Sequence, residues 1–218
     1  TVGAVTGQGK GLGSGGSLGD GLGGTGGGLF GARGDHRRGL GLGKGTPGSE
    51  ASVDMGLRWL AAPQSAHGAW DLDAYYAACP DADLCGGLRN RSFAAFNVGA
   101  TGLSTLAFLG AGHTHQDGVH QEAVAAALKF LLLSQRPDGG FGPQFEGMTY
   151  NHALATLALA ELYAMTRDER VGAAAQRGVA WIERAQQAGG GWDYSNQPTG
   201  RNDSSVAGWQ VMTMKSAR

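Results

Sequence analysis

The sequence predicts an all-α protein built from repeated helical hairpins, and three observations support this prediction. A short signature, Gln-x3-Gly-x-aromatic, occurs three times. Each copy follows a stretch whose apolar residues recur at helical spacing, so a helix and a turn repeat together. No stretch shows the alternation of apolar and polar residues that marks a half-exposed strand. The signature residues are Gln64, Gly68 and Trp70 in the first copy, Gln135, Gly139 and Phe141 in the second, and Gln186, Gly190 and Trp192 in the third.

Three of the expected helices end in the signature, and they cover residues 53–60, 124–133 and 171–185. We expect Ser49 or Ser52 to cap the first of them, because a hydroxyl can accept hydrogen bonds from the free N–H groups of a first turn. The middle helix is apolar on more than one side, which predicts contacts on more than one side.

The other three expected helices alternate with these and are rich in small residues. They cover residues 98–109, 150–165 and a stretch through 206–214 that Asn202 or Asp203 would cap. Glycines lower helix propensity, so their presence in 98–109 indicates that neighbouring helices pack closely there. Hairpins of this kind bury their faces by stacking side by side.

The signature has a physical role in such a stack. Its glycine permits a tight turn, and its glutamine amide can bond backbone groups at a helix end. Its aromatic ring can then pack over the joint. These tasks are structural and carry no chemistry.

Residues 1–48 hold about half of the 41 glycines of the chain. Such a segment cannot bury enough apolar surface to offset its ordering entropy. We therefore expect a disordered Gly-rich linker over 1–48 and a helical repeat domain over 49–218. The helical pattern still runs at Arg218 without a cap, so we expect that domain to be truncated at its C-terminus.

Charge and hydropathy exclude some partners. The formal net charge is −1, which gives no case for a nucleic-acid partner. No apolar run approaches the ~20 residues that a membrane-spanning helix needs. The chain starts at Thr1, so a membrane tether upstream of residue 1 is compatible with the sequence.

Cys79 and Cys85 lie in a long polar loop. A disulfide, two free thiols and a metal site all stay open, and we adopt the disulfide because a loop this short closes at modest entropic cost. A disulfide would indicate an oxidising compartment. We therefore expect a cell-envelope or extracytoplasmic location, with a cytoplasmic one as the alternative.

The repeated signature, with hairpins about fifty residues apart, resembles the α/α-toroid superfamily. Its members include squalene–hopene and other terpene cyclases and the β subunits of protein prenyltransferases. The Gly-rich leader, the loop cysteines and the stretch from Asp203 to Met212 are most similar to uncharacterised bacterial proteins with prenyltransferase/squalene-oxidase repeats. This resemblance covers residues 50–218 and implies a partial α/α-toroid.

The resemblance implies two kinds of chemistry that the residues can be tested against. A cyclase starts its reaction with a protonated acid on an Asp-x-Asp-Asp motif. Asp71 and Asp73 come nearest to that motif, but Ala74 takes its last position and the stretch directly follows a turn signature. We interpret both as solvated loop carboxylates.

A prenyltransferase β subunit binds zinc through an Asp-x-Cys pair and a later histidine. Asp83, Cys85 and His152 have those residue types. The pair stands well before the helix at which the family places it, and the disulfide would use Cys85. We therefore expect no cofactor, with zinc as a weak alternative.

Three further side chains concern the core and the loops. Glu161 falls near the apolar stripe of its helix, and a hydrogen-bonded core glutamate is the expected explanation. His113 and His115 are expected to be exposed loop histidines.

The sequence as a whole predicts a non-catalytic binding or scaffold module for a protein or apolar ligand. The alternative is a terpenoid cyclase or prenyltransferase-like enzyme acting on a polyprenyl substrate.

Overall fold

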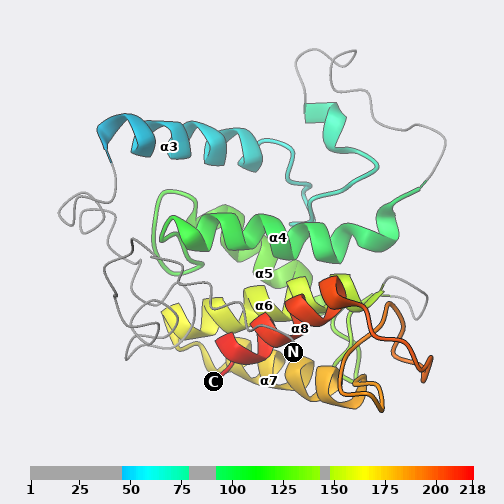
Figure 1. The fold of residues 1–218 in the computed structure, drawn as a ribbon. Helices are drawn as coiled ribbons and strands as arrows, with labels where there is room; N and C mark the ends of the chain where they lie inside the picture. The colour runs from blue at the N-terminus through cyan, green and yellow to red at the C-terminus, as the bar shows by residue number, and fades with distance from the viewer. Residues whose placement is uncertain (1–45, 79–91, 143–147) are drawn as a thin grey trace, which may run out of the picture.

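The computed structural model describes residues 46–78, 92–142 and 148–218, and in these ranges the regular structure is helical (Figure 1). No helix in these ranges is long and apolar enough to cross a membrane. The all-α prediction is confirmed. The elements are α3 (Pro47–Ala61), η1 (Tyr75–Ala78), η2 (Ala94–Phe96), α4 (Asn97–Gly110), α5 (Gln121–Ser134), α6 (Met148–Thr166), α7 (Glu169–Arg184) and α8 (Ser204–Ser216).

Some expectations fall outside these ranges. Nearly all of the expected linker over 1–48 does so, and so do Asp83 and the cysteine pair Cys79 and Cys85. The linker and the disulfide therefore stay predictions.

The start of α3 differs from the prediction. Thr46, rather than Ser49 or Ser52, is the cap, because its side chain accepts a hydrogen bond from the Ser49 backbone N–H at 3.1 Å. The Ser49 hydroxyl in turn accepts from the Thr46 backbone N–H at 2.8 Å. Pro47 follows at the first helical position, where its missing N–H costs nothing. The helix therefore includes the last two residues of the expected linker.

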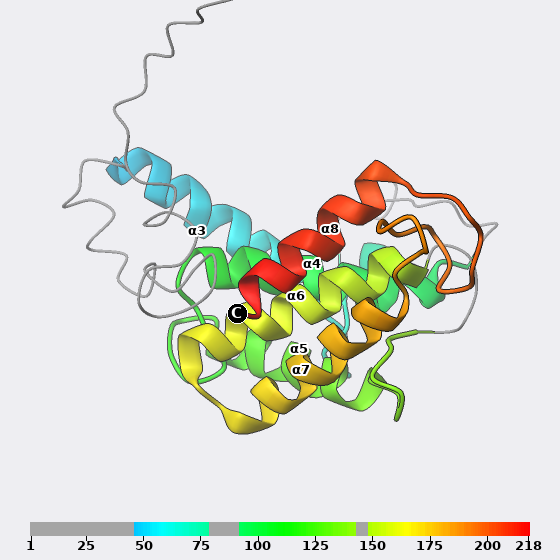
Figure 2. The same ribbon diagram turned by 60° about the horizontal axis from the view of Figure 1, so that its bottom comes forward.

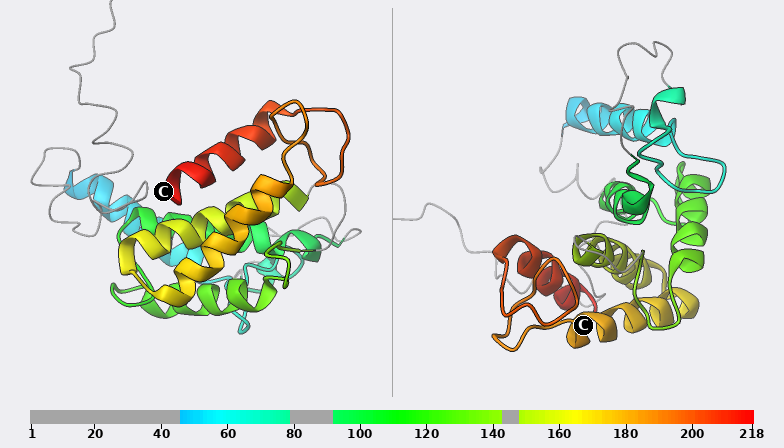
Figure 3. Two further views of the ribbon diagram at one scale, coloured as in Figure 1. Left: turned by 90° about the horizontal axis from the view of Figure 1, so that it is seen from below. Right: turned by 90° about the vertical axis from the view of Figure 1, so that its right-hand side faces the viewer.

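The helices form two layers. In one layer, α4, α6 and α8 lie side by side, and we call this the inner row (Figures 2 and 3). The helices that end in a signature, α3, α5 and α7, are called the outer helices, and α5 and α7 pack on α4 and α6 respectively. The two compositional classes of helix thus correspond to the two layers. The largest fully buried side chains include Phe108, Leu109, Leu131, Leu157, Leu159 and Ile182.

Glycine lets the first two helices of the inner row approach each other closely. A Cβ atom built on Gly102 of α4 would lie 2.7 Å from the carbonyl carbon of Leu154 in α6. Such a distance forces neighbouring backbone to move, so any side chain at this position would separate the two helices. The close packing expected from the glycines of this helix is therefore present.

Each signature forms a tight turn whose glycine has a positive φ. The φ values are 87° at Gly68, 87° at Gly139 and 86° at Gly190. The glutamine side chain closes each turn, because its Nε2 donates to the carbonyl of that glycine at 3.0, 3.1 and 2.7 Å respectively. The three copies therefore share one local geometry.

The first two signatures also bind the following outer helix. Gln64 Nε2 donates to the carbonyl of Ala123 in α5 at 2.9 Å, and Gln135 Nε2 donates to the carbonyl of Ala174 in α7 at 2.9 Å. These two glutamines therefore bond backbone carbonyls both of their own turn and of the next outer helix.

The tryptophans bond the helix end instead. Trp70 Nε1 donates to the carbonyl of Leu60 at 2.8 Å, and Trp192 Nε1 donates to the carbonyl of Ile182 at 2.8 Å. Each carbonyl lies near the C-terminus of the helix that precedes the turn, where intrahelical partners run out. In the first signature, Trp70 thus bonds the end of its own helix while Gln64 bonds the next outer helix.

We predict that Gln135→Ala lowers the free energy of unfolding by about 1–3 kcal/mol, because it leaves backbone carbonyls without their donor. Gln186→Ala is the matched control. It removes only the bond within the turn from an exposed side chain, so the loss should be smaller. Urea unfolding in dilute protein measures both, and equal losses would contradict the role of the contact with α7.

Candidate functional site

Asp73, half of the incomplete cyclase-like motif, holds the chain entering the inner row. Its carboxylate accepts hydrogen bonds from the Ser92 hydroxyl at 2.6 Å, the Phe93 N–H at 2.7 Å and the Ala94 N–H at 3.1 Å. The Ser92 hydroxyl, followed by the Phe93 N–H, lowers the pKa of Asp73. The carboxylate is therefore ionised and acts as a cap for the short helix η2.

Asp71 has a related local task. One carboxylate oxygen accepts from the Asp73 backbone N–H at 2.9 Å. The N–H of Leu72 between them donates to the side-chain oxygen of Asn97 at 2.9 Å, where α4 begins. This arrangement ties the first turn to α4 across the long polar loop. We had expected solvated carboxylates, and the structure gives both of them backbone partners.

Glu161 is the buried carboxylate to which the helical pattern pointed. It lies in α6 with an exposed fraction of 0%, and it has at least one interaction partner. A carboxylate at this position is costly to bury without a partner. Glu161 is therefore a core carboxylate with partners in the surrounding structure.

His152 is enclosed at the second joint. Its ring centroid lies 4.1 Å from that of Trp181 and 5.6 Å from that of Phe141. The Nε2 atom lies 3.0 Å from the carbonyl of Gly178 and donates to it. Burial lowers the pKa of His152 to about 3, so the ring is neutral at ordinary pH.

The contacts of His152 engage one of its two ring nitrogens. The Nε2 is held by a carbonyl and two aromatic rings flank the imidazole, while the buried Nδ1 has no hydrogen-bond partner. In the described ranges no three His, Cys, Asp or Glu side chains gather as a metal site would require. The other two side chains of the zinc alternative, Asp83 and Cys85, lie outside the described residues.

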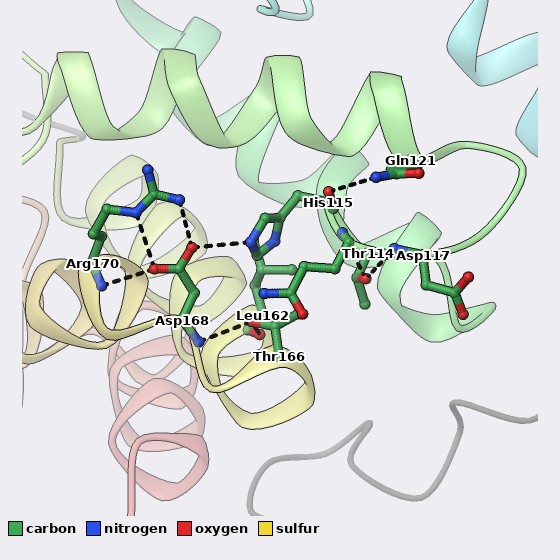
Figure 4. Close-up of polar contacts among 9 residues, drawn as sticks. Thr114, His115, Asp117, Gln121, Leu162, Thr166, Asp168 and Arg170 are labelled. Carbon is green, nitrogen blue, oxygen red and sulfur yellow. Dashed lines mark hydrogen bonds and ion pairs between the residues drawn. The ribbon is translucent and has the colours of Figure 1, made fainter.

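The loop histidines are more buried than expected. The exposed fraction of His113 is 5%, and the His115 side chain is similarly covered. His115 Nε2 lies 3.2 Å from an oxygen of Asp168, the residue that caps α7 (Figure 4). The prediction of exposed histidines was wrong because the loop from α4 to α5 packs against the loop from α6 to α7.

Asp168 is the centre of this cluster. It accepts from the backbone N–H of Arg170 at 2.9 Å and forms an ion pair with the Arg170 guanidinium at 2.7 Å. The Arg170 side chain, more than any other group, holds the pKa of Asp168 well below its usual range. Around it, Gln121 Nε2 donates to the His115 carbonyl at 3.2 Å (Figure 4). Every contact fixes a loop or a helix start, so the cluster joins two hairpins.

Sequence reasoning missed this cluster because its members are far apart in the chain. One signal was available, however. Both loops connect an inner helix to an outer one, so a regular stack brings them to the same end of the molecule. An aspartate before α7 and a histidine in the preceding equivalent loop could have been paired on that basis.

A cavity of about 180 Å³ lies among α6, α7 and the end of α8. Tyr163, Arg167, Gln176 and Ser216 are among its lining residues. Small-molecule sites usually measure about 300–1,000 Å³. This cavity is therefore too small for a polyprenyl substrate.

We predict that Asp168 makes stability depend on acid pH. Its pKa is lower in the folded state, so its contribution is complete above the unfolded value of about 3.9 and is lost as pH falls below it. The melting temperature of the wild type should therefore fall more steeply below about pH 4 than that of Asp168→Asn. Asp117→Asn, an exposed aspartate in the neighbouring loop, is the control. Parallel curves for wild type and Asp168→Asn would contradict the assignment.

Comparison with known proteins gives one result that fits this fold. The family described as squalene-hopene cyclase C-terminal domain matches residues 44–218. Neither the curated proteins nor the solved structures yielded a match. The matched range spans all of the described helices, and the stacked hairpins form a partial α/α-toroid. The chain therefore belongs to the squalene–hopene cyclase C-terminal domain family.

Proposed function

We propose that the helical domain is a non-catalytic binding or scaffold module. One observation carries the proposal: Asp73 of the cyclase-like motif binds backbone N–H groups, and these contacts favour its ionised form. A polyene cyclase needs a carboxylic acid that keeps its proton until it meets an alkene, and this requires a raised pKa. The pKa of Asp73 is lowered instead.

The other described aspartates with a shifted pKa point the same way. A proton donor at neutral pH would need a shift toward higher pKa, and each of these groups shows the reverse. The residues with a lowered pKa are Asp73, Asp138, Asp168, Asp193 and Asp203.

The inner row offers a surface for an apolar partner. On α4, Ala100, Leu103, Ser104 and Ala107 share one helical face, and none of them is buried. Leu103 is 52% exposed, and Val211 on α8 is 54% exposed. Small and apolar side chains of this kind fit a protein helix or a lipid chain better than a polar metabolite.

Two further expectations enter the proposal. The partner is an apolar ligand or a protein rather than a nucleic acid. The location is outside the cytoplasm, for which the expected pairing of Cys79 with Cys85 is the sole support. Titration of free thiols in the purified, oxidised protein tests the location argument, since two reactive thiols would remove it.

The alternative function is a terpenoid cyclase or prenyltransferase-like enzyme, and two observations favour it. The family takes its name from a cyclase. Glu161 also supplies a fully buried carboxylate in the inner row. Its burial makes Glu161 the carboxylate to test first for an acid role.

Incubation of the full chain with squalene, followed by gas chromatography and mass spectrometry, separates the two functions. We expect no cyclised hydrocarbon, because the lowered pKa of Asp73 keeps this carboxylate ionised. Cyclised product that disappears in Glu161→Gln and persists in Asp73→Asn would establish the enzyme with Glu161 as its acid. Glu183→Gln, an exposed glutamate on α7, is the matched control.

A further inference from the structure

Each of the first two signatures forms a joint with the outer helix that follows it, and the two joints can be compared position by position. In both, the glutamine bonds its own turn and the next outer helix at nearly equal distances. Both signature glycines have a φ of 87° and lie against the backbone of that helix. A side chain that only one of the two joints possesses is therefore not needed for a joint to form.

Two arginines of α7 reach the second signature, and the first joint has no counterpart to them. Arg177 Nη2 donates to the side-chain oxygen of Gln135 at 2.6 Å, and Arg184 Nη2 donates to the Asp138 carbonyl at 2.6 Å. Both acceptors are neutral, and neither guanidinium forms an ion pair among the described residues. Counted from the signature glutamines, the same positions on α5 hold Ala126 and Leu133. The two positive charges are therefore additions to a joint that forms without them.

A third arginine lies in the turn itself, where the first signature has Ser65. Arg136 Nε and Nη2 lie 3.2 and 3.0 Å from the two carboxylate oxygens of Asp138. The Gly140 N–H donates to the same carboxylate at 2.9 Å. Arg136 therefore compensates the charge of Asp138. Three guanidiniums and one carboxylate leave this joint with an excess of two positive charges.

An indole N–H group lies between the two arginines of α7. Trp181 shares their helical face and is 6% exposed. Trp70 and Trp192 donate to helix carbonyls, but Trp181 Nε1 has no acceptor among the described residues. A buried N–H without an acceptor has a free-energy cost that a bound acceptor removes. The first joint has Phe130 at this position, which keeps the aromatic ring and lacks the donor.

Gly140 gives the donors room to converge beside the turn. A Cβ atom built on Gly140 would lie 2.2 Å from Arg136 Nη2 and 2.7 Å from Trp181 Nε1. The first signature has Ala69 at this place, where neither of these donors exists. The second joint thus brings a guanidinium and an unpartnered indole N–H together on one side of the turn.

We propose that the second joint binds the phosphate group of a ligand. The phosphate oxygens accept from the Trp181 N–H and the Arg136 guanidinium, and Arg177 and Arg184 supply the opposite charge. Each guanidinium has five N–H donors in a plane that matches pairs of phosphate oxygens, so donors remain after the bonds to the turn. A phosphate monoester carries a charge of about −1.5 to −2 near neutral pH, which balances the excess of the site. A single carboxylate would balance only half of it.

Two sources can present this group, a free phosphate and the headgroup of an anionic phospholipid. The site lies between the turn at residues 135–142 and α7, apart from the apolar face that the proposed function assigns to α4 and α8. The inference is therefore independent of the proposed absence of catalysis.

Isothermal titration calorimetry of the full chain with inorganic phosphate and with pyrophosphate tests the inference. Low ionic strength is needed, because salt screens exposed charges. We expect saturable binding at one site per chain. The first joint supplies the variants, since Arg177→Ala, Arg184→Leu and Trp181→Phe each introduce the residue that an intact joint already accepts there.

The double variant Arg177→Ala with Arg184→Leu should weaken binding at least about tenfold, because it removes the uncompensated charge. Trp181→Phe should weaken it about fivefold, since it keeps the ring and every charge but removes the N–H donor. Circular dichroism and thermal melting check that each variant stays folded.

Arg58→Gln is the matched control. It removes one exposed positive charge from α3, outside the second joint, and should bind phosphate like the wild type. A loss in Arg58→Gln as large as that in the double variant would overturn the proposal, because general charge attraction would then explain the binding.

Flotation with vesicles of phosphatidylcholine, with and without phosphatidic acid, distinguishes the two sources. Capture only by vesicles that contain phosphatidic acid, lost in the double variant, assigns the site to a lipid headgroup even if the free anions do not bind. Binding of the free anions without capture assigns it to a free phosphate. Binding in neither experiment would overturn the proposal, and so would binding that all three substitutions leave unchanged.

Discussion

The fold depends on one repeated hydrogen bond, the donation from a signature glutamine to the backbone of the following outer helix. The acceptor carbonyl lies inside a helix, but a carbonyl oxygen has two lone pairs and can take a second donor. Gln64 and Gln135 each use one amide nitrogen to close their own turn and to bind the next hairpin. The same side chain therefore makes one hydrogen bond within its turn and one to a residue far along the chain.

Glycine is the residue that makes this joint geometrically possible. Gly68 and Gly139 adopt a positive φ and also lie against helix backbone, so two separate constraints select glycine at each position. Gly102 applies the same device between helices of the inner row. Close backbone approach therefore joins neighbouring helices within the inner row and fixes the signature turns on the outer helices.

The polar side chains serve this architecture. Asp73 caps the approach to α4, Asp168 caps α7 and binds His115, and His152 donates to Gly178. Each of these groups could carry chemistry in another setting. Here their partners hold them in the charge state that suits a structural role, which is why membership of a cyclase family does not by itself assign a reaction.

Much of the fold could be predicted from the sequence. The three signatures, the alternation of helix types and the Asp203 cap of α8 all follow from local spacing, and the structure contains them. Local spacing also identifies Glu161 as a side chain near the core.

Other features depend on contacts that spacing does not encode. Thr46 caps α3 from within a glycine-rich flank, where no apolar pattern marks the boundary. The burial of His113 and His115 and the pairing with Asp168 require two loops to meet across the stack. The second acceptor of Gln64 and of Gln135 lies on the next outer helix, so it becomes visible only once the hairpins are stacked.

Native-state hydrogen exchange tests the central claim most directly, because it reports the opening of each helix separately. If Gln135 couples successive hairpins, Gln135→Ala should speed exchange in the N-terminal half of α7 as well as in its own turn. Gln186→Ala should affect only the turn at 186–192. Faster exchange confined to residues 135–141 in Gln135→Ala would contradict the account, because the glutamine would then stabilise its turn and nothing beyond it.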